Sequence, residues 1–157
     1  MSQLRSVLLA IEHATIHRDE LAQVVARVER NLQFAHQQLG QLEGYAADTD
    51  ARWISSAARE ISAQIIRHQY QFMDRLQQAI VMQTGVISGV VQQLEQAKSN
   101  LLQAEFRLSG LNQILKSRKA ALLRGQQVRE QRQTDEFAAM QHARNRAMPM
   151  SGERHDY

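Results

Sequence analysis

A heptad repeat of apolar residues near the start of the chain is the feature that most limits how it can fold. Apolar side chains recur at alternating intervals of three and four residues, which places them along one stripe of a helix. A stripe this narrow is typical of a helix that packs against one other helix rather than into a broad core. Eleven of its twelve positions are apolar, and it consists of Leu4, Val7, Ile11, Ala14, Arg18, Leu21, Val25, Val28, Leu32, Ala35, Leu39 and Leu42.

The composition also favours helices over strands. The only proline is Pro149, and aromatic residues make up 5% of the chain, so the seams must be filled by aliphatic side chains and alanine. With no cysteine, the chain has neither disulfides nor thiolate ligands or nucleophiles. We predict an all-α protein built as a long antiparallel two-helix coiled coil, that is, a helical hairpin.

A cluster of turn-forming residues follows the first seam. Gly40, Gly44 and the stretch 48–50 combine a helix C-cap residue with side chains that start helices. We therefore expect helix 1 at about residues 3–46, a turn at about 47–53 and helix 2 at about 54–140. Residues 1–148 then form a single coiled-coil hairpin, and residues 149–157 form a disordered tail.

The second half of the chain carries a longer seam in two phases. A shift of one position near Phe72 predicts a stutter, and we expect the helix to continue through Gly85 and Gly89. The first phase is Ile54, Ala58, Ile61, Ile65, His68 and Phe72. The second phase is Met73, Leu76, Ile80, Gln83, Ile87, Val90, Leu94, Ala97, Leu101, Ala104, Leu108, Leu111, Leu115, Arg118 and Leu122.

The two seams differ in length, which predicts an overhanging C-terminal helix. A reversal near residue 51 would place Leu4 beside the neighbourhood of Lys98 and leave the seam positions from Leu101 to Leu122 without a partner in the same chain. An unpaired apolar seam indicates a surface for another molecule.

The predicted overhang is also basic. Residues 107–132 contain seven cationic residues and a single anionic one, Glu130. The cationic residues are Arg107, Lys116, Arg118, Lys119, Arg124, Arg129 and Arg132. This pattern suits an acidic protein cavity, a membrane surface or nucleic acid, and an ordinary solvated helix face has the same composition. Nucleic acid is disfavoured because stacking aromatic residues and a known DNA-binding pattern are missing.

No arrangement typical of catalysis is found in the sequence. His13 and His17 have the spacing of a metal-binding pair, but they lack the motif glutamate and a third ligand, which favours solvated histidines. No glycine-rich phosphate loop is present, so we expect no enzyme activity, no cofactor and no metal.

Two arginines, Arg18 and Arg118, lie in the seams. The side chain of each must reach solvent or pair with a carboxylate, and for Arg118 that carboxylate would come from another chain. Charged residues interrupt any early apolar run, which predicts a soluble cytoplasmic protein with no membrane span.

Four strings of the chain stand out by their order and spacing. They are Arg18-Asp19-Glu20, Gln38-Leu39 followed by Leu42 and Tyr45, Gln71-Phe72-Met73 with Leu76 and Ala79-Ile80, and Gln131-Arg132-Gln133-Thr134-Asp135-Glu136-Phe137-Ala138. Together they resemble the flagellar FliJ family of the type III export apparatus. The resemblance covers most of the chain. It implies an antiparallel coiled coil similar to the central stalk of rotary ATPases.

The resemblance also implies a set of partners. Members of this family insert into the hexameric export ATPase and promote its assembly and hydrolysis, contact the export-gate protein FlhA, and assist export chaperones. The gate-binding residues of the family correspond here to Gln38, Leu42, Tyr45, Phe72, Leu76 and Ala79. Family members often have a second Tyr at the position of Thr49 and a His at that of Gln83, so this chain departs from the pattern at the rim.

Combining the overhang with the resemblance gives a hypothesis for ATPase binding, in which the basic segment enters the ring. Its residues are Leu108, Leu111, Leu115, Lys116, Arg118, Lys119 and Leu122. The expected location is the cytoplasm, peripherally at the inner membrane at the flagellar base, with a role in motility and chemotaxis. Two alternatives are the equivalent stalk protein of a virulence injectisome and a generic coiled-coil adaptor or chaperone.

Overall fold

A computed structural model of the chain describes residues 2–56 and 62–147. It contains two helices, α1 from Ser2 to Ser56 and α2 from Ala63 to Ala147, and no strand in the described part. The two helices pack against each other as a helical hairpin. The all-α prediction is therefore confirmed, while the predicted tail at 149–157 lies outside the described residues.

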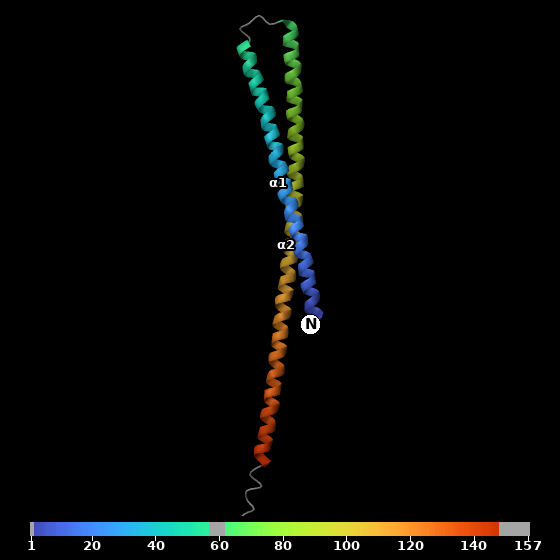
Figure 1. Ribbon diagram of the computed structural model, residues 1–157, viewed down its shortest axis with the longest axis vertical. Helices are drawn as coiled ribbons and strands as arrows, with labels where there is room; N and C mark the ends of the chain where they lie inside the picture. The colour runs from blue at the N-terminus through green and yellow to red at the C-terminus, as the bar shows by residue number, and fades with distance from the viewer. Residues whose placement is uncertain (1, 57–61, 148–157) are drawn as a thin grey trace, which may run out of the picture. The chain divides into compact units, whose positions relative to one another are not determined.

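The chain divides into two compact units. One unit is residues 13–108, in which the second part of α1 runs antiparallel to the first part of α2 (Figure 1). The other combines residues 1–12 with residues 109–157. No helix in the described residues is long and apolar enough to cross a membrane.

The heptad seam of α1 forms the interface, as predicted. All twelve positions from Leu4 to Leu42 are buried or half-buried. The second phase in α2 is likewise buried or half-buried from Met73 to Leu115. The buried residues of the larger unit are Ala14, Val25, Val28, Ala35, Leu76, Ala97, Ala104 and Leu108, and Val7 is buried in the smaller one. No described large side chain is fully buried, so the interface is thin.

The predicted turn at residues 47–53 is wrong, because these residues belong to α1. The seam of α1 continues through half-buried Ala46, Thr49 and Trp53, and their packing offsets the cost of the two preceding glycines. Helix α2 begins after Ser62, whose hydroxyl and carbonyl accept hydrogen bonds from Ile65 N and Ile66 N at 3.4 and 3.2 Å. Ser62 thus caps α2.

The predicted stutter at Phe72 is also wrong. Among the first-phase residues that the structure describes, Ile54, Ile65 and Phe72 are 74%, 54% and 50% exposed, and His68 is exposed as well. The seam instead continues without a shift through half-buried Gln69. The expectation that α2 would pass unbroken through Gly85 and Gly89 is confirmed.

Candidate functional site

Two surfaces contain the residues singled out from the sequence. We call Gln38, Leu42, Tyr45, Phe72, Leu76 and Ala79 the aromatic patch, which lies in the unit of residues 13–108. The basic segment is Leu108, Leu111, Leu115, Lys116, Arg118, Lys119 and Leu122. All of the basic segment except Leu108 lies in the smaller unit, so the two surfaces are described separately.

Some residues of the aromatic patch lie in the interface between the two helices, and others are exposed to solvent. Leu76 is 8% exposed, and Leu42 and Ala79 are half-buried, so these three side chains hold the helices together. Tyr45 and Phe72 are 63% and 50% exposed. An aromatic ring in water contributes little to folding, so these two rings are available to a partner.

Gln83 connects the two helices at one end of the aromatic patch. Its side-chain amide donates to the backbone carbonyl of Ala35 at 2.9 Å and to Gln38 Oε1 at 3.2 Å. A polar residue bonded across a coiled-coil seam favours one alignment of the helices over others. Gln83 is one of the polar residues of the α2 seam, and its hydrogen bonds determine which residues of α1 pack against which residues of α2.

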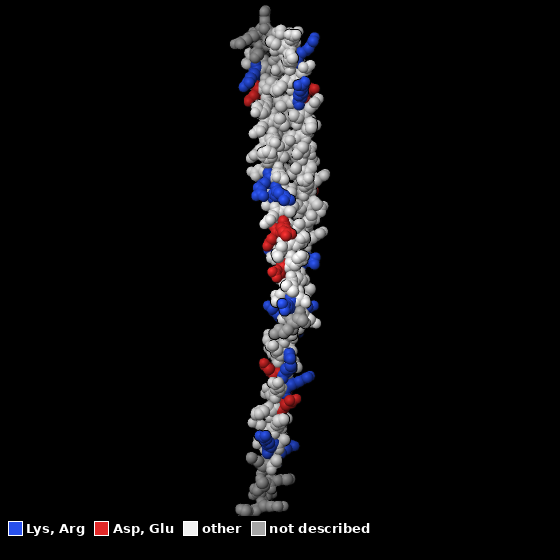
Figure 2. Space-filling view, turned by 45° about the vertical axis from the view of Figure 1, so that its right-hand side comes forward, with Lys and Arg blue, Asp and Glu red and all other residues white. Residues whose placement is uncertain are grey.

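A band without charged residues includes Gln38, Leu42, Leu76 and Ala79 of the aromatic patch and ends just before Tyr45 and Phe72. Neither residues 31–42 of α1 nor residues 76–94 of α2 include Asp, Glu, Lys or Arg. Figure 2 shows this band as a white region below the charged side chains near the hairpin end. Several exposed apolar side chains that the sequence did not single out lie in it, among them Phe34, Val81 and Met82. The uninterrupted lack of charge was the signal that could have identified them.

The basic segment is less free than predicted. Arg118 Nη1 donates to the backbone carbonyl of Gln3 at 3.4 Å, and Leu122 lines a shallow pocket together with Leu4. The prediction that Leu101–Leu122 have no partner in their own chain is therefore wrong. The turn comes later than expected, which brings the first turns of α1 to this part of α2.

Within the basic segment, apolar and charged residues have different environments. Leu108 is buried and Leu111 and Leu115 are half-buried, so these leucines serve the fold. The three cations Lys116, Arg118 and Lys119 are exposed, and Leu122 is 43% exposed. Only the cations and the edge of Leu122 are available to another molecule.

The uncovered part of α2 begins one residue beyond Leu122. We call residues 123–147 the uncovered segment: every residue in it except Gly125 is exposed, and no other helix runs beside the red end of α2 in Figure 1. Its exposed apolar side chains include Leu123, Val128, Phe137 and Met140. Residues 123–147 are therefore the actual overhang, whereas the sequence predicted it at Leu101–Leu122.

The two seam arginines are satisfied locally. Half-buried Arg18 donates to Asp19 Oδ1 through Nη2 at 2.8 Å and Nε at 3.0 Å. Arg118 uses the Gln3 carbonyl rather than a carboxylate of another chain. His13 and His17 line one groove with Arg107, and the described residues hold no group of three or more potential metal ligands.

Two packed helices with exposed apolar surfaces define a helical-hairpin coiled-coil protein. Residues 1–147 match the family profile described as flagellar FliJ protein. The chain therefore belongs to the flagellar FliJ family, and it is a component of flagellar-type, type III protein export. Comparisons with curated proteins and with solved structures find no match.

Proposed function

We propose that this protein is the stalk-like coiled coil of the flagellar export apparatus, inserting into the hexameric export ATPase, promoting its assembly and activity, coupling it to the export gate and assisting export chaperones. The observation that carries this proposal is the FliJ family match over residues 1–147. Such a component needs no catalytic group of its own. It acts through contacts that differ among the subunits of a ring, and so it biases their conformations.

The exposed cations of the basic segment and the uncovered segment support ring insertion. Exposed Lys116, Arg118 and Lys119 are followed by a single uncovered helix, which is narrower than a helix pair. A narrow basic helix fits a cavity with acidic walls, where opposite charges favour both approach and orientation. We therefore place the ATPase contact on these cations and on the uncovered segment, with the leucines of the basic segment holding the helix in place.

The aromatic patch supports a contact with the gate protein FlhA. Tyr45 and Phe72 present exposed rings beside a charge-free band, and aromatic residues at the centre of apolar surfaces dominate many protein interfaces. Peripheral association at the cytoplasmic face of the inner membrane follows from binding the gate.

Addition of the purified protein to the cognate export ATPase should raise its rate of hydrolysis. The triple variant K116E/R118E/K119E should reduce that stimulation, because it reverses three exposed charges at the proposed contact. The matched control R27E/R30E/K98E makes the same charge change in the unit of residues 13–108, where all three cations are exposed, and should stimulate normally. Equal loss in both variants would assign the effect to net charge and contradict the site.

Binding to the cytoplasmic region of FlhA tests the aromatic patch separately. Tyr45→Ala and Phe72→Ala should each weaken binding, since interface aromatic residues are frequent energetic hot spots. Phe106→Ala removes a similarly exposed ring outside both the patch and the charge-free band and should leave binding unchanged. Sedimentation separates a stalk from the adaptor alternative, because a tight dimer of the free protein would favour the adaptor.

A further inference from the structure

A small pocket lies near the end of the hairpin, next to the aromatic patch but lined by none of its six residues. Asp50 and Trp53 of α1 and Gln69, Tyr70 and Met73 of α2 line it. Its volume is about 230 Å³. Pockets that hold drug-sized ligands measure about 300–1,000 Å³. The pocket is therefore of a size for one long side chain rather than for a cofactor.

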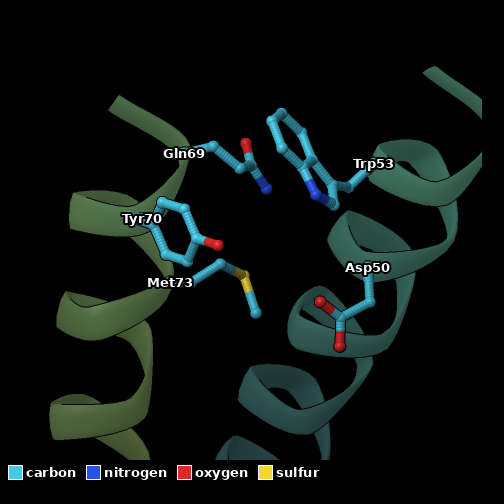
Figure 3. Close-up of a pocket in the computed structure, with 5 residues that line it drawn as sticks. All are labelled: Asp50, Trp53, Gln69, Tyr70 and Met73. Atoms are coloured by element: carbon cyan, nitrogen blue, oxygen red, sulfur yellow. The ribbon is translucent and has the colours of Figure 1, made fainter. Parts of the chain in front are cut away.

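The lining combines one carboxylate with two aromatic rings. Figure 3 shows the Trp53 indole, the Tyr70 hydroxyl, the Met73 thioether and the Asp50 carboxylate arranged around a common space. Trp53 is half-buried, so its ring is held in place, whereas Tyr70 is 71% exposed. Asp50 is the sole charged residue of the lining and has no ion pair with any other described residue.

These groups select a cation with an apolar stem. An anion would be repelled by Asp50, and a purely apolar side chain would cover the carboxylate without neutralising it. A cationic head group gains from both the carboxylate and the faces of Trp and Tyr, while its methylene stem packs on Met73. Arginine fits better than lysine, because its planar guanidinium stacks on aromatic rings and can donate two parallel hydrogen bonds to one carboxylate.

We propose that this pocket is a receptor for an arginine side chain presented by a partner protein. Asp50 pairs with the guanidinium, Trp53 and Tyr70 provide the stacking surfaces, and the Gln69 amide oxygen accepts a further N–H. The pocket shares no residue with the proposed ATPase and FlhA contacts, and the inference holds whether or not those contacts exist.

Trp53 is the only tryptophan of the chain, so its indole N–H gives a single reporter of the pocket. The full-length protein is titrated with Nα-acetyl-arginine amide while the indole N–H signal is followed by NMR. The signal should shift saturably with the arginine probe, less with Nα-acetyl-lysine amide, and least with the uncharged Nα-acetyl-norleucine amide. Equal responses to the arginine and norleucine probes, or no saturable shift with arginine, would overturn the proposal.

Two variants assign the binding to the pocket. Asp50→Asn should weaken arginine binding by roughly threefold or more, as expected for a partly exposed ion pair, and Tyr70→Ala should weaken it by a similar factor while leaving the reporter in place. Asp48→Asn is the matched control, because Asp48 is an exposed aspartate of the same helix that does not line the pocket. If Asp48→Asn weakens binding as much as Asp50→Asn, the response reflects general charge and the proposed receptor is wrong.

Discussion

The hydrogen bonds of Gln83 allow a direct measurement of what holds the two helices in register. Gln83 donates at 2.9 Å to the Ala35 carbonyl in a partly buried position, and at 3.2 Å to an exposed Gln38. The Ala35 carbonyl lies inside α1, so it keeps its intrahelical hydrogen bond when the Gln83 side chain is removed. Truncation at Gln83 therefore measures the bond itself and not the cost of an unsatisfied carbonyl.

Gln83→Ala should destabilise the protein modestly. A neutral hydrogen bond contributes about 0.5–1.5 kcal/mol net, and the exposed bond to Gln38 lies at the low end of that range. The higher helix propensity of alanine offsets a small part of the loss. We expect a net loss of about 1 kcal/mol, which lowers Tm by roughly 2–4 °C in a chain of this size.

Thermal unfolding followed by far-ultraviolet circular dichroism provides the assay. Gln77→Ala is the control, because Gln77 is an exposed glutamine of the same helix, and its Tm should stay at or slightly above that of the parent. Gln83→Leu should recover the lost stability by burying apolar area in the seam. It would also remove the polar contact that favours one alignment of the two helices over others. An unchanged Tm for Gln83→Ala would refute the reasoning, as would a Gln83→Leu variant less stable than Gln83→Ala.

Three further outcomes are expected. Gly85→Ala and Gly89→Ala should each raise stability by about 0.5–1 kcal/mol in denaturant unfolding, because both glycines are helical and an added Cβ meets nothing within 4 Å; a loss of stability would contradict the open surroundings of these positions. Ala104→Leu should cost about 1–3 kcal/mol, since Ala104 is 6% exposed in the interface, whereas Ala120→Leu on the exposed face should cost almost nothing. Phe137→Ala should leave Tm unchanged within the error of the melt and lower ATPase stimulation, and a large fall in Tm would show that the exposed ring has a structural contact.

Most of the interface could be predicted from heptad spacing, and the turn could not. The seam positions from Leu4 to Leu42 and from Met73 to Leu115 are buried or half-buried because their spacing keeps them on one stripe of each helix. Gly40 and Gly44 indicated a helix end, yet glycine costs only about 1 kcal/mol in a helix interior, which continued seam packing outweighs.

Near the hairpin end, apolar character and heptad spacing point to different residues. Ile54 and Ile65 are strongly apolar but exposed, and the less apolar Thr49 and Gln69 are half-buried in the seam instead. The pocket between Trp53 and Tyr70 cannot be predicted from apolar character alone, because its members are close only in the register that the spacing sets. The aromatic patch follows from the family resemblance, and the basic segment follows from the predicted overhang combined with it; the assays above test both.

The alanines of the interface have a consequence for how the hairpin opens. Four of the nine buried residues in the described part of the chain are alanines, and each provides fewer methyl and methylene groups than leucine would, at about 0.8 kcal/mol per buried CH₂. The packing free energy between α1 and α2 is therefore distributed along the interface, and no single layer of side chains contributes most of it. Such a pair opens from the ends of its paired region inward, and amide hydrogen exchange should slow progressively towards the middle of that region.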